Sequence, residues 1–194
     1  MKNKLSLNKQ LKEARNYIYE SRNHIYLIVL IFFVFAVFGF IFSSHLGFIE
    51  DFLKELLGKI KGLNGFEITV FILQNNLQSA FFGMLLGVFF GIYPIIGIIG
   101  NGVVLGYVFS LVIAEEGIVS LWKILPHGIF ELPAIFIALG LGLKLGGFVF
   151  ADKGKKFKEL KKRFYQSVNA FLMVILPLLV LAAIIEGILI VLLG

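Results

Sequence analysis

Six polar side chains interrupt the long apolar segments of this chain, and their types could support chemistry. They are Asn75, Asn76, Asn101, His127, Glu131 and Glu186. His127 and Glu131 are four residues apart, so they share one face of a helix. A charged side chain at the centre of a bilayer costs about 2.5–3.5 kcal/mol on insertion scales. Polar residues in such segments are therefore candidates for a functional site.

These residue types fit four roles. Protonated or hydrogen-bonded carboxyls could join helices to one another, or the same groups could form a proton, ion or solute site of a transport protein. His127, Glu131 and Glu186 are also metal-ligand types, although a second His is missing. A hydrolase would need a nucleophile or an activated water, and neither is indicated. We predict no enzyme, and a metal ion is the one cofactor these residues could hold.

The depth of each candidate residue in the membrane can be estimated from its position along its helix. With a helical rise of about 1.5 Å per residue, Glu131 lies about 8 Å below the outer start of its segment. Glu186 lies about 25 Å from the inner start of the last segment, and Asn76 about 13 Å below the outer face. Asn101 falls in the inner half. We expect His127, Glu131 and Glu186 to converge in the outer half, with Asn76 within hydrogen-bonding reach.

The segments that carry these residues are apolar enough to lie in a membrane. The chain is 59% hydrophobic with a mean hydropathy of +0.94, whereas soluble domains are about 45–50% apolar. A hydrocarbon core about 30 Å thick needs roughly 20 apolar residues per crossing. We predict an all-α polytopic membrane helix bundle with about five transmembrane helices. The predicted crossings are residues 25–43, 68–90, 94–113, 126–150 and 168–193.

Amphipathic segments flank the predicted crossings. Residues 1–24 combine basic side chains with helically spaced Leu5, Leu7, Leu11 and Ile18, which is typical of a helix on the membrane surface. Residues 44–66 show a second amphipathic pattern. We divide the chain into a cytoplasmic basic amphipathic segment, residues 1–24, and a multispanning membrane domain, residues 25–194.

Basic residues are concentrated in residues 1–24 and 152–163. Five crossings place both segments on one side of the membrane, and the positive-inside rule makes that side the cytoplasm. We predict a multi-pass plasma-membrane protein with its N-terminus inside and its C-terminus outside. The net charge of +6 then reflects topology, so the bilayer is a predicted partner and nucleic acid is not. The absence of Cys excludes disulfides and thiol chemistry.

Small residues recur at a spacing of four in three of the predicted crossings. They are Gly83, Gly87, Gly91, Gly102, Gly106, Gly142 and Gly146. Small residues at this spacing let two helices approach closely. The contact could lie within one chain or between two copies. We predict a homo-oligomer, a dimer first, through the ridge formed by Gly83, Gly87 and Gly91.

The segment Pro126–Ala134, with the sequence PHGIFELPA, resembles the signature of the stage II sporulation protein M family. Three shorter features agree with the same family, and the resemblance covers about residues 25–194. They are the pair Asn75-Asn76, Asn101-Gly102 followed by Gly106, and Ile185-Glu186 in the last predicted helix.

The resemblance implies a function. Family members in endospore-forming bacteria are membrane subunits of the engulfment complex, and they recruit and position two peptidoglycan-degrading partners. Relatives also occur in organisms that neither sporulate nor make peptidoglycan. We therefore expect a membrane scaffold that positions other membrane or envelope proteins. The alternative is a transporter or channel subunit that uses His127, Glu131 and Glu186.

Overall fold

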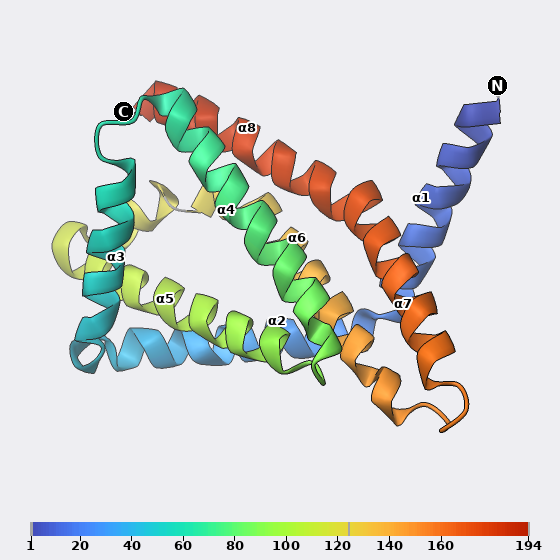
Figure 1. Ribbon diagram of the computed structural model, residues 1–194. Helices are drawn as coiled ribbons and strands as arrows, with labels where there is room; N and C mark the ends of the chain where they lie inside the picture. Colours follow the sequence, from blue (N-terminus) through green and yellow to red (C-terminus); the bar gives the residue numbers. More distant parts are fainter. Residues whose placement is uncertain (1, 124, 194) are drawn as a thin grey trace.

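The structure, a computed structural model, describes the backbone of residues 2–123 and 125–193 and the side chains of residues 6–121, 128, 129 and 131–188. Every regular element in the described residues is helical, as predicted (Figure 1). The α-helices are α1 (Lys2–Glu20), α2 (Arg22–Ile41), α3 (Gly47–Ile60), α4 (Gly65–Leu85), α5 (Ile92–Glu116), α6 (Leu125–Gly146), α7 (Lys156–Ala170) and α8 (Leu176–Leu193). The short helical segments are η1 (Ser43–His45), η2 (Leu86–Val88), η3 (Ile118–Lys123), η4 (Gly147–Phe150) and the π-helical η5 (Phe171–Ile175).

Four helical stretches of the described chain are long and apolar enough to cross a membrane. They are Arg22–Ile41, Ile92–Glu116, Glu131–Phe150 and Lys156–Ile188. Helix α4 is not among them, because the four amides of Gln74, Asn75, Asn76 and Gln78 lie near its centre. The all-α membrane bundle is confirmed, whereas a fifth crossing by α4 stays a prediction.

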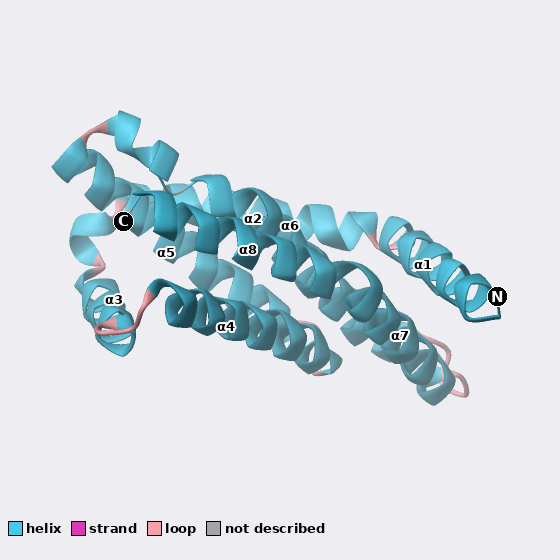
Figure 2. Cartoon of the chain, turned by 90° about the horizontal axis from the view of Figure 1, so that it is seen from above, coloured by secondary structure: helices cyan, strands magenta, loops and turns pink. Residues whose placement is uncertain are grey.

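Helix α6 occupies the centre of the bundle. It contacts α2 and α5 on one side and α4 and α8 on another, and more than half of its membrane segment is buried. Helices α2 and α5 lie side by side along most of their length, as both views show (Figures 1 and 2). Residues on α6 can therefore meet partners from almost every other helix.

The elements outside the long apolar helices gather at two ends of the bundle. Figure 1 shows α1, the turn between α4 and α5, and the loop between α6 and α7 at one end, and α3, η3 and the end of α8 at the other. We call the first the basic end, defined by residues 1–24 and 151–166, and the second the opposite end. The amphipathic pattern predicted for residues 44–66 corresponds to α3.

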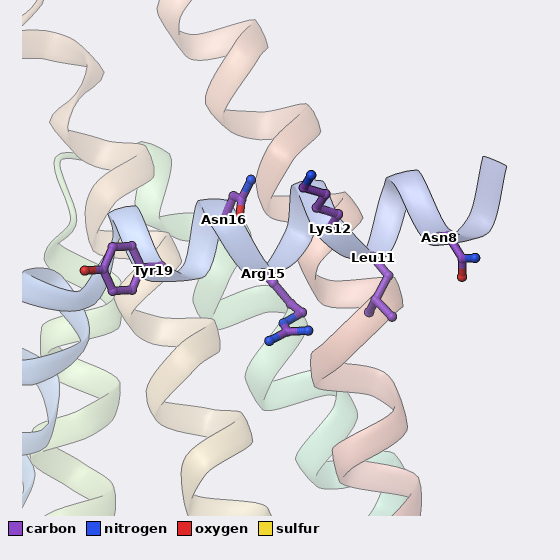
Figure 3. A pocket seen from close by; sticks show the side chains of 6 residues that line it. All are labelled: Asn8, Leu11, Lys12, Arg15, Asn16 and Tyr19. Atoms are coloured by element: carbon purple, nitrogen blue, oxygen red, sulfur yellow. The ribbon is translucent and has the colours of Figure 1, made fainter. Parts of the chain in front are cut away.

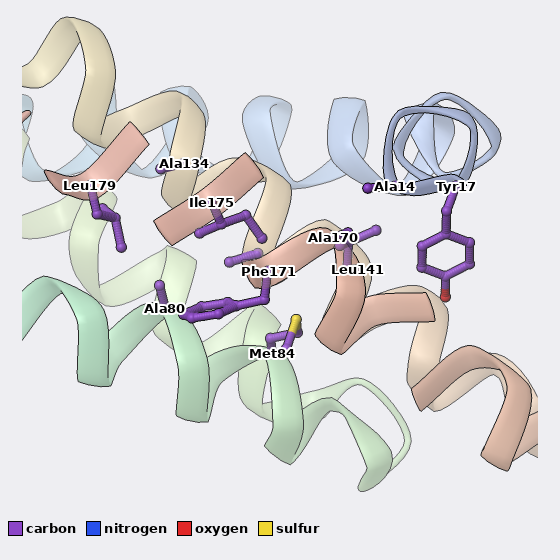
Figure 4. Close-up of a cluster of buried hydrophobic side chains, with 11 residues drawn as sticks. Ala14, Tyr17, Ala80, Met84, Ala134, Leu141, Ala170, Phe171, Ile175 and Leu179 are labelled. Carbon is purple, nitrogen blue, oxygen red and sulfur yellow. The ribbon is translucent and has the colours of Figure 1, made fainter. Parts of the chain in front are cut away.

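Two clusters of buried apolar side chains hold the helices together. The larger one joins α1, α4, α6, η5 and α8, and Figure 4 shows Phe171 and Ile175 between Met84 and the backbone of α6. The smaller one packs Phe32 of α2 edge to face against Phe136 of α6, with ring centroids 5.0 Å apart. Both clusters include side chains of α6, which fixes the rotation of that helix about its axis.

Two local departures from regular helix have sequence causes. The chain reverses between α4 and α5 at Phe90 and Gly91, which have positive φ angles of 58° and 73°, so the reversal predicted near Gly91 is confirmed. The π-helical turn of η5 lies immediately before Pro177. Proline has no N–H to donate to the preceding turn, and a wider turn accommodates that missing bond.

Candidate functional site

Three of the predicted site residues come together in the structure. The Asn76 side chain, on α4, hydrogen-bonds to the carboxyl group of Glu131 on α6, and Glu186 on α8 lies near enough to act electrostatically on Glu131. We call these three residues the carboxyl cluster. Glu131 and Glu186 lie six and seven residues from the helix ends at Leu125 and Leu193, so both are about 10 Å from the opposite end of the bundle.

Packing of α4, α6 and α8 positions the carboxyl cluster. These three helices contact one another pairwise, and Thr69 of α4 fits against Gly187, the residue after Glu186. Pro133 lies inside α6, two residues after Glu131, so the carbonyl of Ile129 has no proline N–H to accept. The site thus combines two carboxyls and an amide, within one turn of α6 from a carbonyl that lacks its usual helical donor.

The other predicted site residues have different surroundings. Asn75 is exposed, and Asn101 is exposed and donates a hydrogen bond to the Gly97 carbonyl of its own helix, at 2.8 Å. The side chain of His127 lies outside the described residues, so its place beside Glu131 stays a prediction. Among the described residues no three His, Asp or Glu side chains form a group that could hold a metal ion.

The glycines are contact points between helices of one chain. A Cβ added to Gly87 would collide with the backbone of Gly142, and one added to Gly106 would collide with the Ala36 carbonyl of α2. Gly91 and Gly146 meet in the same α4–α6 region. The ridge of Gly83, Gly87 and Gly91 therefore faces α6, and the prediction that it joins two copies was wrong.

The same packing explains the remaining glycines of the predicted set and adds others that the spacing did not reveal. Gly102 lies against Phe32, and Gly142 against Met84. Gly39 meets the backbone of Val103, and Gly140 meets that of Ile25. Neither of these last two is four residues from another glycine in the predicted set, so the period of four missed them.

A second polar cluster, not predicted from the sequence, lies at the basic end. The Tyr17 hydroxyl is 3.3 Å from the Ser167 hydroxyl and donates toward the Arg163 carbonyl at 3.4 Å. The Lys144 ammonium lies 4.0 Å from the centre of the Tyr17 ring and 3.6 Å from a Glu20 carboxylate oxygen. We call these five residues the junction cluster.

The junction cluster encloses the Lys144 side chain. A lysine near the end of a membrane helix commonly extends toward the headgroups, but the Lys144 side chain is only 15% exposed. Its backbone carbonyl accepts a 2.8 Å hydrogen bond from Arg163 Nη1. Burial raises the pKa of Tyr17 above its usual 10.0, and the hydrogen bond with Ser167 partly offsets this effect.

Comparisons with known proteins agree on one family. A family model described as stage II sporulation protein M matches residues 28–189. An uncharacterized protein of Methanocaldococcus jannaschii is 32% identical over 165 residues, which cover 84% of this chain and 90% of that protein. No solved structure matches. The match includes all three residues of the carboxyl cluster, and the chain belongs to the stage II sporulation protein M family.

Proposed function

We propose that this chain is a non-enzymatic membrane scaffold that positions partner membrane or envelope proteins. The observation that carries the proposal is the arrangement of amphipathic helices. Helices α1 and α7 at the basic end and α3 at the opposite end extend from a bundle whose helices touch backbone to backbone at Gly87 and Gly106. A tightly packed core with exposed helices at its ends suits a protein that binds others.

Helix α3 is the partner-binding element in this proposal. It exposes Phe48, Phe52 and Leu57, and an apolar hollow of 380 Å³ separates it from α5. Surface-exposed pairs of opposite charge, Lys54 with Glu50 at 2.6 Å and Lys59 with Glu55 at 2.9 Å, lie along the same helix. Exposed aromatic residues with a charged rim are typical of protein interfaces.

We also propose that the N-terminus is cytoplasmic. Both basic segments lie at one end of the bundle, and positive loops stay on the cytoplasmic side. Cysteine labelling at Lys158 with a membrane-impermeant maleimide tests this orientation in intact cells, because the chain has no other Cys. We expect labelling at position 158 only after the cells are permeabilised. Labelling in intact cells would mean that the N-terminus is outside.

Self-association, in this proposal, uses α5 instead of the ridge of Gly83, Gly87 and Gly91. A Cβ at Gly97 would meet no other atom within 4 Å, and Asn101 exposes an amide one turn further along α5. An exposed amide in hydrocarbon gains hydrogen bonds from an identical amide of a second copy. Replacing Asn101 by Leu is expected to reduce dimer cross-linking in liposomes, and unchanged cross-linking would exclude this face.

A second function is favoured by one specific observation. The carboxyl cluster brings two acidic groups from different helices together in the membrane domain, and such groups often mark ion or proton pathways. In this alternative, the chain is a transporter or channel subunit, with the carbonyl of Ile129 as a further ligand.

Photo-cross-linking tests the scaffold directly. A photoreactive phenylalanine analogue at Phe52 of α3 should give discrete protein adducts in native membranes. The same analogue at Phe33 of α2 is a matched control, because the two side chains are 49% and 55% exposed. Adducts at Phe52 that are absent at Phe33 support a partner on α3. The same adducts at both positions, or none at either, contradict the proposal.

A further inference from the structure

The basic end concentrates the positive charge of the molecule. Thirteen of the 18 Lys and Arg residues lie in residues 1–24 and 151–166, together with four of the 12 acidic residues. The two segments are far apart in the sequence but adjacent in the structure, since α1 packs against α7. Their charges therefore act as one surface.

Specific contacts hold α1 on α7. Ala14 and Tyr17 are buried between the two helices, and the Asn169 side chain donates a 3.0 Å hydrogen bond to the Gln10 carbonyl. Only Ser21 separates α1 from α2. The position of α1 is thus set at two points, one where it joins a membrane helix and one along α7.

The free face of α1 mixes basic and apolar side chains. It contains a hollow of 590 Å³ lined by Asn8, Leu11, Lys12, Arg15, Asn16 and Tyr19. Figure 3 shows Leu11 and Arg15 on one edge of this face and Lys12 and Asn16 on the other. Helix α7 repeats the mixture, because Phe157 and Tyr165 are exposed among its lysines.

This mixture distinguishes between anionic partners. A nucleic acid or an acidic peptide would need the cations but not exposed Leu11 and Tyr19. A membrane surface uses both, because aliphatic and aromatic groups enter the boundary below the headgroups while Lys and Arg meet the phosphates. Helices α1 and α7 lead directly into apolar helices, which holds them at the level of the headgroups.

We propose that the basic end is a binding surface for anionic phospholipid headgroups. Lys12 and Arg15 bind the phosphate groups, and Leu11 and Tyr19 contact the upper part of the acyl chains. Helix α7 supplies a second set of cations through its lysines. This role goes beyond the scaffold function, because a scaffold does not require one class of lipid. It would also concentrate anionic lipid around any partner held by the chain.

The test uses the purified full-length chain in detergent with added lipid. Dioleoylphosphatidylglycerol is expected to raise the melting temperature more than dioleoylphosphatidylcholine, and native mass spectrometry should show more bound copies of the anionic lipid. The double variant Lys12→Gln, Arg15→Gln should lose affinity for the anionic lipid by about fivefold for each cation removed. The variant Lys12→Arg keeps the positive charge and should keep the preference for the anionic lipid.

A matched control carries the same charge change at the opposite end. The double variant Lys54→Gln, Lys59→Gln removes two exposed lysines of α3 and should bind the anionic lipid as the unmodified chain does. The proposal is overturned by equal binding of the two lipids, by equal losses in both double variants, or by a duplex oligonucleotide that displaces phosphatidylglycerol. A variant that does not fold is replaced by Lys158→Gln, Lys161→Gln on α7, with the same expected loss.

Discussion

The carboxyl cluster and the junction cluster are polar groups at different ends of an apolar bundle, and their charges differ. In the junction cluster a lysine meets a carboxylate at 3.6 Å, an aromatic ring at 4.0 Å and, through its carbonyl, an arginine. In the carboxyl cluster the Asn76 amide hydrogen-bonds to Glu131, Glu186 lies nearby, and the described side chains add no cation. Each cation of the junction cluster has a carboxylate partner, because Arg163 also pairs with Glu159 at 3.5 Å. Two like charges, by contrast, need a proton, a cation or more donors.

The comparison indicates different roles. The junction cluster joins α1, α6 and α7, so it sets the geometry of the basic end. The carboxyl cluster joins α4, α6 and α8 and carries the residues on which a transport function would depend. Substitutions in the two clusters, and in the helix contacts that create them, should therefore change different properties of the protein.

The largest effect is expected where η2, which follows α4, meets α6. Gly87→Leu places a side chain into the Gly142 backbone, which should destabilise the chain by about 1–3 kcal/mol or more. The carboxyl cluster should be disrupted because α4 carries Asn76. The loss is measured as a lower melting temperature of the purified chain in detergent, with Gly58→Leu as the control, since a Cβ at Gly58 meets no other atom within 4 Å. Equal losses in the two variants would contradict the assigned packing.

A smaller effect is expected at the junction cluster. Lys144→Met keeps the length of the side chain but removes its contact with the Tyr17 ring and the ion pair with the exposed Glu20. The cation–π contact contributes about 0.5–2 kcal/mol. Limited proteolysis should then cleave α1 faster while α6 and α8 stay protected. Unchanged cleavage of α1 would mean that Lys144 does not hold it.

A still smaller effect is expected in the carboxyl cluster. Glu131→Gln keeps an oxygen that can accept from Asn76, so we expect a change in the free energy of unfolding within about 1 kcal/mol. The change should be the same with and without added sodium, potassium or calcium, if the cluster is structural. Stabilisation by one of these ions that disappears in the variant would reveal an ion site, because a ligand of the folded state stabilises it by mass action.

The smallest effect concerns pH. Because the pKa of Tyr17 is raised above 10.0 in the folded chain, its contribution to stability is complete below pH 10 and is lost as the pH rises through the higher folded value. The melting temperature should thus fall less between pH 9 and 11 in Tyr17→Phe than in the unmodified chain. The lysines are common to both proteins, so the difference isolates Tyr17. If the melting temperature falls equally with pH in the two proteins, the Tyr17 hydroxyl is exposed to water in the folded chain.

The sequence predicted those parts of the structure that depend on local pattern. Long apolar segments predicted the helices, and the gap between the predicted crossings 68–90 and 94–113 coincides with the reversal at Phe90 and Gly91. The depth estimate placed Asn76, Glu131 and Glu186 at similar levels, and the structure brings the three together. It did not place the His127 side chain, which lies outside the described residues.

Other features depend on contacts that no local pattern contains. Tyr17 and Ser167 are 150 residues apart, and each looks like an ordinary polar residue in a basic segment. The glycine spacing indicates close approach but not the partner, and the ridge of Gly83, Gly87 and Gly91 packs against α6 of the same chain instead of a second copy. The charge pattern likewise showed two basic segments but not that they pack against each other.

Ion flux tests the central claim, that the chain is a scaffold and not a transporter. The purified chain is reconstituted into liposomes that contain a pH-sensitive dye, and a potassium diffusion potential drives proton entry. For a scaffold, protons should enter at the rate seen in protein-free liposomes, with the unmodified chain and with Glu131→Gln alike, and sodium and potassium tracers should behave the same way. Proton entry several-fold faster than in protein-free liposomes, and lost in Glu131→Gln, would show that the chain is a transporter.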